Sequence, residues 1–292
     1  MFEKIISNTS KIVVGNSEKI RLTLAAIISE GSILIEDYPG SGKTTFAKAI
    51  TQSLGLNFKR VQFTSDLLPS DILGFNIFSD DKLNFQKGPI FTNIVLADEL
   101  NRGSPKSQSA FLEAMEEKNV SIDGISHSLP EPFFVIATQN PMDTSGTSSL
   151  PDSQLDRFMV SYSLSELNDD DKIEMLKKEI RFVDDNSEKI DWKKIKEKKN
   201  KVTVKDEIYK YVINIEQTIQ SIDRKIYISA RCLKQIIDLA RGWALINEKD
   251  YVTHQDIKDT IPYILRHRIR FLNQEEKIEF VKKEILEKID IN

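Results

Sequence analysis

A short apolar run leads directly into a glycine-containing turn near the start of the chain. The run is Ile33–Glu36, and the turn that follows reads Asp-Tyr-Pro-Gly-Ser-Gly-Lys-Thr-Thr. A buried strand, such a turn and a following helix can together wrap a polyphosphate, because backbone N–H groups and the helix N-terminus point at the anion. In this arrangement Lys43 would reach the β- and γ-phosphates, and the Thr44 hydroxyl would bind Mg²⁺. The predicted phosphate-binding residues are Pro39, Gly40, Ser41, Gly42, Lys43, Thr44 and Thr45.

The turn departs at one position from the full phosphate-loop pattern, G-x-x-x-x-G-K-[ST]. Asp37 stands where that pattern has its first glycine. Aspartate tolerates unusual backbone angles better than most residues, but it would add a negative charge near the phosphates. A protein that binds nucleotide with little turnover is therefore one interpretation that the residues leave open.

Two carboxylates follow a second apolar run, 55 residues after Lys43, at Asp98 and Glu99. The carboxyl ends of parallel strands are where open α/β sheets bind ligands. Asp98 would belong to the Mg²⁺ shell, directly or through a water, and Glu99 would polarise an attacking water. A third apolar run ends at Asn140, whose amide could orient the same water. Taken alone, the Asn140-Pro141 pair is more typical of a turn.

The elements that must position these residues change character along the chain. Residues 1–165 alternate short apolar runs with helical patterns, which predicts an α/β core with a parallel sheet, and residues 166–292 predict an all-helical domain. The predicted strands are Ser32–Ile35, Lys59–Phe63, Asn93–Ala97, Pro132–Thr138 and Phe158–Tyr162. The predicted helices are Ser17–Ile28, Lys43–Leu54, Ser104–Lys118, Asp152–Asp156, Asp169–Phe182, Lys205–Ile222, Ser229–Asn247 and Thr253–Arg270, the last capped by Thr253.

Composition narrows the classes of protein. The 292 residues carry 41 Lys and Arg against 45 Asp and Glu, a net charge of −4 that gives no global attraction to nucleic acid or anionic membranes. A single cysteine, Cys232, excludes an internal disulfide framework and favours a reducing compartment. With no leader-like or membrane-spanning apolar segment, the expected location is the cytoplasm.

The order of strand, phosphate loop, apolar-Asp-Glu and strand-end Asn resembles that of an AAA+ ATPase. The amino-acid sequence in and around these motifs resembles the MoxR family of those proteins. The segments that carry the resemblance are Arg60–Ile72, Gln86–Phe91, Leu96–Arg102, Gln108–Glu117, Ala137–Pro141 and Leu150–Phe158. Together they extend the resemblance over about residues 12–270, and several are long enough to be specific. The implied fold is a P-loop AAA+ core followed by a helical lid.

The resemblance also implies roles for single residues. Asn140 matches the sensor asparagine, which reverses the preference for a turn, and Lys43 and Glu99 match catalytic positions. Arg157 matches the arginine finger that one subunit supplies to its neighbour, with Arg102 as the rival for that role. Arg231, in the first turn of a helix capped by Ser229, matches a second sensor that touches the γ-phosphate.

The implied activity is ATP hydrolysis with Mg²⁺ by a homo-oligomeric ring, with a hexamer expected. The family suggests chaperone-like remodelling or maturation of a protein client, often with a von Willebrand factor A domain partner. Two insertions, near 74–89 and as a β-hairpin near 119–128, are expected to protrude from the core. A DNA-remodelling ATPase remains the alternative in a different class, against which the acidic composition argues. The six lysines of 193–201 predict a solvated helix face or loop, and their use is open.

Overall fold

The computed structural model describes residues 1–79, 81–141, 150–164, 167–177, 190–222, 226–274 and 276–289. By its internal contacts the chain divides into two compact units, each assembled from several pieces of sequence. The first unit comprises residues 1–17, 34–157 and 163–190, and the second comprises 18–33, 158–162 and 191–292. The division into a core at 1–165 and a lid at 166–292 stays a prediction. In the part of the chain that is described, no helix is long and apolar enough to cross a membrane.

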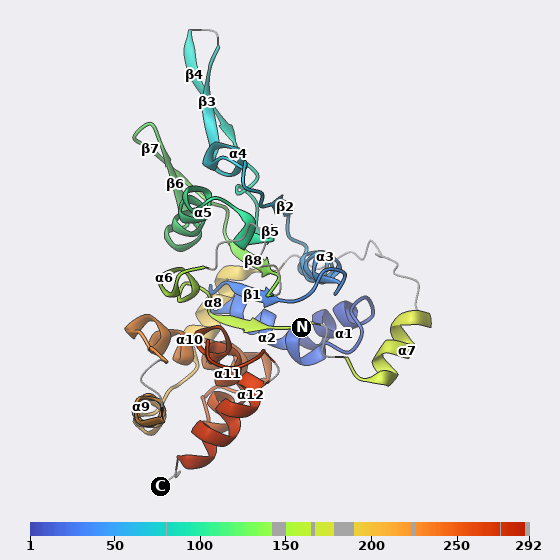
Figure 1. The fold of residues 1–292 in the computed structure, drawn as a ribbon, viewed down its shortest axis with the longest axis vertical. Helices are drawn as coiled ribbons and strands as arrows, with labels where there is room; N and C mark the ends of the chain where they lie inside the picture. Colours follow the sequence, from blue (N-terminus) through green and yellow to red (C-terminus); the bar gives the residue numbers. More distant parts are fainter. Residues whose placement is uncertain are drawn as a thin grey trace. The chain divides into compact units, whose positions relative to one another are not determined.

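A five-stranded sheet has the strand order β2-β5-β8-β1-β9 (Figure 1). Its strands are β1 (Ile33–Glu36), β2 (Phe58–Gln62), β5 (Ile94–Asp98), β8 (Phe134–Gln139) and β9 (Val160–Tyr162), each within two residues of its predicted bounds. β2 pairs in parallel with β5, and β5 pairs in parallel with β8. Every residue of β1 and β5 is buried, which explains why these strands appear in the sequence as unbroken apolar runs. The predicted fold class is confirmed.

The helices of the first unit begin with contrasting signals. They are α1 (Phe2–Ser10), α3 (Lys43–Leu54), α4 (Pro69–Leu73), α5 (Pro105–Glu117), α6 (Asp152–Leu155) and α7 (Asp169–Lys177). α5 starts conventionally, because Ser104 Oγ accepts a hydrogen bond of 3.2 Å from the Ser107 N–H and a proline follows at the first helical position. α3 instead has Gly42 as its N-cap, and no side-chain hydrogen bond caps it. Its first N–H groups therefore have no side-chain acceptor of that kind.

Two antiparallel hairpins extend from the first unit on one side, beyond α4 and α5 (Figure 1). They are β3 (Gly74–Ser79) with β4 (Lys82–Lys87), and β6 (Asn119–Ile122) with β7 (Ile125–Ser128), both within the segments predicted to form protrusions. The rings of Phe85 and His127 stack with centroids 4.0 Å apart. Asn76 Nδ2 also donates a hydrogen bond of 2.6 Å to Asp123 Oδ2. Side chains therefore join the two hairpins to each other.

The second unit is mainly helical. Its helices are α2 (Ser17–Ile28), α8 (Trp192–Lys201), α9 (Asp206–Ile222), α10 (Ala230–Ile246), α11 (His254–Leu265) and α12 (Glu276–Phe280). α2 packs closely on α10, because a Cβ at Gly242 would lie 2.6 Å from the Ala25 carbonyl oxygen. Ser29 Oγ adds a hydrogen bond of 2.7 Å to the Asp238 carbonyl. Thr253 caps α11 as predicted, with Asp256 completing a capping box.

The last predicted helix differs from the structure. The helix expected to reach Arg270 ends at Leu265, and a 3₁₀ turn, Arg266–Arg268, follows it. The Arg268 guanidinium donates to the Ile264 carbonyl, an acceptor that a continuing helix would use for a backbone bond. The lysine-rich stretch is helix α8, with Ile195 and Lys199 buried. The predicted extension of α7 beyond residue 177 lies outside the described residues.

Candidate active site

The phosphate loop joins the end of β1 to the start of α3. Gly40 and Gly42 have φ angles of 85° and 86°, in the left-handed region that favours glycine. An ideal Cβ would meet nothing within 4 Å at either position, so conformation and not space explains why glycine stands there. The loop and the α3 N-terminus together provide the backbone donors that suit a polyphosphate.

Lys43 lies across its own loop. Its Nζ donates to the carbonyl oxygens of Tyr38 at 2.6 Å and Asp37 at 3.1 Å, and to Ser41 Oγ at 3.4 Å. Burial lowers the pKa of this ammonium group, while the carboxylates of Asp37, Asp98 and Glu99 act in the opposite direction. A bound polyphosphate would replace these neutral acceptors of Lys43 by charged oxygens, which form stronger hydrogen bonds with an ammonium group.

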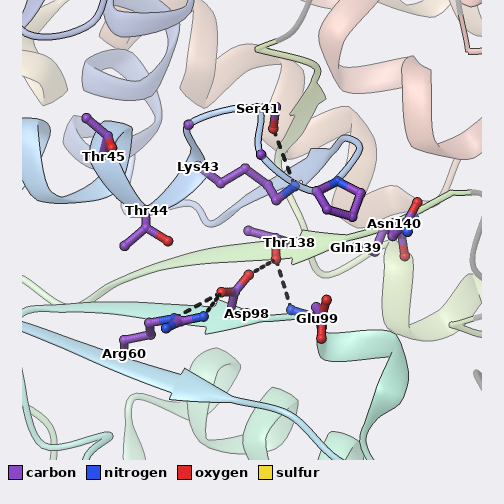
Figure 2. A pocket seen from close by; sticks show the side chains of 13 residues that line it. Ser41, Lys43, Thr44, Thr45, Arg60, Asp98, Glu99, Thr138, Gln139 and Asn140 are labelled. Atoms are coloured by element: carbon purple, nitrogen blue, oxygen red, sulfur yellow. Dashed lines mark hydrogen bonds and ion pairs between the residues drawn. The ribbon is translucent and has the colours of Figure 1, made fainter.

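One pocket contains the predicted phosphate loop and the acidic strand end (Figure 2). It is lined by Pro39–Thr45, Arg60, Asp98, Glu99 and Thr138–Asn140. The strand order explains the meeting, because β1, β8 and β5 are consecutive neighbours in the sheet. Each of these strands delivers its following residues to the same edge. The sequence predicted all of these lining residues except Arg60, Thr138 and Gln139.

Thr138 connects the end of β8 with both acids of β5. Its Oγ1 donates a hydrogen bond of 2.6 Å to Asp98 Oδ1 and accepts one of 2.9 Å from the Glu99 N–H. Glu99 itself has a φ of 54°, a left-handed backbone conformation that is uncommon for a side chain of this kind. The buried Thr138 hydroxyl therefore helps to fix the backbone position from which the Glu99 side chain extends.

Donors from two other elements hold the two carboxylates. Arg60, in the middle of β2, donates from Nε at 3.0 Å and from Nη2 at 2.6 Å to Asp98 Oδ2. Gln62 Nε2 donates to Glu99 Oε2 at 2.7 Å, and Arg102 Nη1 donates to the same oxygen at 3.1 Å. Both acids of the pocket are thus paired with donors from the chain itself, as Figure 2 shows for Asp98.

Sequence reasoning did not identify Arg60, Gln62 or Thr138 as site residues. Gln62 lies directly opposite Asp98 in the parallel register of β2 and β5. Gln62 and Thr138 lie at or next to the carboxyl ends of the predicted strands Lys59–Phe63 and Pro132–Thr138, where polar residues approach ligands, so applying that rule to every strand end would have selected these two. Arg60 lies in the middle of β2, and its own strand gives no such signal.

The carboxylate of Asp37 is hydrogen-bonded to a segment outside the phosphate loop. It is 1% exposed, and it accepts hydrogen bonds from the Leu164 N–H at 2.8 Å and from Ser163 Oγ at 3.1 Å. Asp37 is also not among the residues with positive φ, so the backbone does not need a glycine there. The charge that was expected beside the phosphates therefore belongs to a carboxylate that is hydrogen-bonded to Ser163 and Leu164. Its remaining effect on the loop is electrostatic, because it acts to raise the pKa of Lys43.

Replacing Asp37 by alanine is expected to lower the free energy of unfolding by about 1–3 kcal/mol, because two donors lose their acceptor in a buried place. Asp37→Asn keeps one acceptor oxygen and should lose less. Chemical denaturation followed by fluorescence and circular dichroism would measure both. Unchanged stability of the alanine variant would contradict this role for Asp37.

The three arginines have different surroundings. Arg157 follows α6, and its Nε lies 3.0 Å from Glu116 Oε2. Arg102 pairs with Glu99 of its own chain, and neither arginine lines the pocket. Arg231 is exposed in the first turn of α10, where Ser229 Oγ accepts the Cys232 N–H at 3.0 Å as a cap. Arg231 belongs to the second unit, so its approach to a phosphate stays a prediction.

The donor set fits Mg²⁺ bound together with a nucleotide. Thr44 offers a hydroxyl oxygen and Asp98 a carboxylate in the same pocket, and Mg²⁺ prefers few protein oxygens completed by waters and phosphates. Among the described residues, no group of three or more His, Cys, Asp or Glu side chains could hold a metal by itself. Thr44 and Asp98 are therefore the residues that would hold the ion.

Comparisons with known proteins agree with this geometry. Residues 32–160 match the ATPase family associated with various cellular activities (AAA), and residues 216–289 match the AAA lid domain. Chaperone MoxR1 of Mycobacterium tuberculosis is 33% identical over 283 residues, 91% of this chain and 75% of that protein. The uncharacterized protein YeaC of Bacillus subtilis is 38% identical over 97% of this chain and 91% of its own length. A crystal structure of a candidate ATPase from Cytophaga hutchinsonii has a TM-score of 0.85 and 35% identity, covering 99% of this chain and 94% of that one.

Proposed function

This chain belongs to the MoxR family of AAA+ ATPases, and on that premise we propose that it hydrolyses ATP with Mg²⁺ to remodel or mature a protein client. The observation that carries the proposal is the single pocket in which the phosphate loop, Asp98, Glu99 and Asn140 meet. A phosphate loop alone would support binding. The carboxylate and amide at the ends of neighbouring strands add the groups that hydrolysis needs.

The proposed division of labour follows the position of each group. Lys43 leaves the loop carbonyls and donates to the β- and γ-phosphate oxygens, while the loop N–H groups hold the chain of phosphates. Mg²⁺ held by Thr44 and Asp98 would neutralise charge on those oxygens. Glu99 accepts a proton from the water that attacks the γ-phosphorus, and the bond to the ADP oxygen breaks with its electron pair leaving on ADP.

The carboxylate of Glu99 is held through one of its two oxygens. Oε2 accepts hydrogen bonds from Gln62 and Arg102, which fix the orientation of the side chain. Its second oxygen, Oε1, is the one that we assign to the water. Asn140, at the same edge of the pocket, orients that water, and Arg231 of the helical unit is proposed to contact the γ-phosphate.

We propose that the working form is a ring of identical subunits, with six as the expected number. Arg157 would then complete the site of the neighbouring subunit, where a guanidinium stabilises the charge that develops on the γ-phosphate. Changes in the bound nucleotide would move the helical lid against the core and so act on the client. A von Willebrand factor A domain protein in the cytoplasm is the proposed partner class, which the family resemblance supports.

The experiment that tests this function is ATP turnover per subunit, measured with Mg²⁺ over a wide range of protein concentration. A rate that rises and then levels off is expected, because sites completed between subunits require assembly. Light scattering on the same samples would show whether the rise follows the formation of larger particles. Lys43→Gln is the matched control, and it should lose nucleotide binding at every concentration.

Two other outcomes would change the proposal. A constant, finite rate with monomeric particles would contradict the ring and leave a complete site within one chain. Tight binding of ATP with no turnover at any concentration would favour a nucleotide-gated scaffold. Because the Asp37 carboxylate is engaged with Ser163 and Leu164, such a result would not be explained by the missing first glycine.

A further inference from the structure

The Asp98 carboxylate is fully engaged by the chain's own donors. Arg60 gives two hydrogen bonds to Oδ2, and Thr138 gives one to Oδ1. The Asp98 side chain is only 10% exposed, whereas the Arg60 side chain is 48% exposed. The carboxylate is therefore held in place, and the guanidinium is the member of the pair with room to move.

Arg60 and Mg²⁺ compete for the same negative charge. The ion shell proposed above needs an oxygen of Asp98, directly or through a water, and Arg60 contacts that carboxylate from inside the same pocket (Figure 2). Two cations beside one small carboxylate repel each other, and the low exposure of Asp98 leaves little water to screen the repulsion. The planar guanidinium group can also donate two hydrogen bonds to a carboxylate, so Arg60 stabilises the arrangement in which no metal is bound.

We propose that Arg60 is a resident cation at Asp98, one that Mg²⁺ must displace when it binds with the nucleotide. Arg60 thereby sets the Mg²⁺ concentration at which the site fills, and it keeps the Asp98 charge compensated at lower concentrations. The proposal rests on the proposed function, because it takes Asp98 as part of the Mg²⁺ site. It assigns Arg60 a positioning role and not a chemical step.

Arg60 also connects the two acids of the pocket. The nitrogen that bonds Asp98, Nη2, donates to Gln62 Oε1 at 2.5 Å, and Gln62 Nε2 in turn bonds Glu99. When Arg60 leaves Asp98, the donor that orients the Gln62 amide leaves as well. Filling the Mg²⁺ site is thereby linked to the hydrogen bonding of Glu99.

The test measures binding and not turnover. The affinity of a fluorescent, non-hydrolysable ATP analogue is determined from EDTA to saturating Mg²⁺, for the wild type and for Arg60→Gln. The variant removes the competing charge, so the Mg²⁺ concentration for half of the full effect should fall about fivefold, a change appropriate to a partly exposed ion pair. Arg60→Lys, which keeps the charge but contacts the carboxylate at one point only, should fall in between.

Lys59→Gln is the matched control. Lys59 is the neighbouring residue on β2, it is exposed and it does not line the pocket, so the substitution removes the same charge from the same strand. Its Mg²⁺ curve should stay within about twofold of the wild type if the effect of Arg60 is local and not a general change in charge. Thermal unfolding of each variant would verify that all of them are folded.

The outcomes separate the inference from the function. If the wild type binds the analogue in a Mg²⁺-dependent way and Arg60→Gln shifts the curve no more than Lys59→Gln, Arg60 does not compete with the ion. A higher Mg²⁺ requirement in Arg60→Gln would overturn the inference as well. If the wild type itself does not bind the analogue, the proposed function fails and the inference fails with it. A last check uses Asp98→Asn, in which an added Arg60→Gln should have no further effect.

Discussion

Replacement of Glu99 by glutamine is expected to leave ATP binding intact and to lower turnover by about 10³-fold, within the range that general-base catalysis contributes. The two functions separate because the groups that hold phosphates lie on the loop, whereas Glu99 follows β5 on the opposite side of the pocket. Glutamine keeps the shape and one acceptor oxygen for Gln62 and Arg102, but it cannot accept the proton of a water. Equilibrium binding and steady-state hydrolysis on the same preparation would measure both quantities.

Glu113→Gln is a suitable control for this substitution. Glu113 lies on α5, is exposed and does not line the pocket, so the same chemical change there should leave turnover unchanged. Turnover at the wild-type rate in Glu99→Gln would remove Glu99 from the mechanism. Loss of binding would instead mean that its contacts with Gln62 and Arg102 shape the nucleotide site.

Removal of the Arg157 guanidinium should lower turnover by about 10³-fold or more in the assembled protein, the effect typical of an arginine finger. The structure also offers a milder explanation of Arg157, its ion pair with Glu116 at 3.0 Å. Partly exposed pairs of this kind contribute about 0–1 kcal/mol to stability, which would not change turnover by orders of magnitude. The rate of Arg157→Ala therefore discriminates between the two roles.

Glu116→Gln is the matched control, because it breaks the ion pair and leaves the arginine in place. It should hydrolyse ATP at nearly the wild-type rate. A loss of only a few-fold in Arg157→Ala, together with a large loss in Arg102→Ala, would assign the trans role to Arg102. The contact of Arg102 with Glu99 in its own chain would then have to give way on assembly.

Mixed assemblies reveal whether Arg157 acts on a neighbour. Glu99→Gln subunits lack the base but carry the arginine, and Arg157→Ala subunits have the opposite defect. Equal mixing should restore about a quarter of the wild-type rate, because half of the sites keep Glu99 and half of these meet a neighbour with Arg157. No recovery in mixtures of proven composition would place Arg157 in the site of its own chain.

The sequence predicted well the bounds of helices and strands that bury one face or both, because burial sets the spacing of their apolar residues. The predicted bounds of α2 and α3 match the structure, and α3 begins directly after the glycine-containing turn. The helix α8 was harder, because six lysines obscure its two buried positions, Ile195 and Lys199. Lys199 is buried with its ammonium 3.7 Å from Asp238 Oδ1, a compensation that comes from a distant part of the sequence.

The candidate site divides in the same way. Residues that act through a local pattern, such as Lys43 and Asp98, could be identified from spacing alone. Arg60 and Thr138 act through contacts across strands, and those contacts depend on the order and register of the sheet. No property of Arg60 within its own strand indicates that it bonds an acid 38 residues later. The surroundings of Asp37 likewise depend on Ser163 and Leu164, far along the chain.

The two linked hairpins of the first unit have a mechanical consequence. The β6–β7 hairpin lies between α5 and β8 in the chain, and β8 ends in the residues that contact Asp98 and Glu99. Because Phe85 stacks on His127 and Asn76 bonds Asp123, a load applied to the tip of either hairpin is shared by both. Each hairpin is followed along the chain by a strand of the pocket: β4 precedes β5, which ends at Asp98, and β7 precedes β8, which carries Thr138. Two short connections, residues 88–93 and 129–133, therefore join the linked hairpins to the two strands whose ends meet in the pocket.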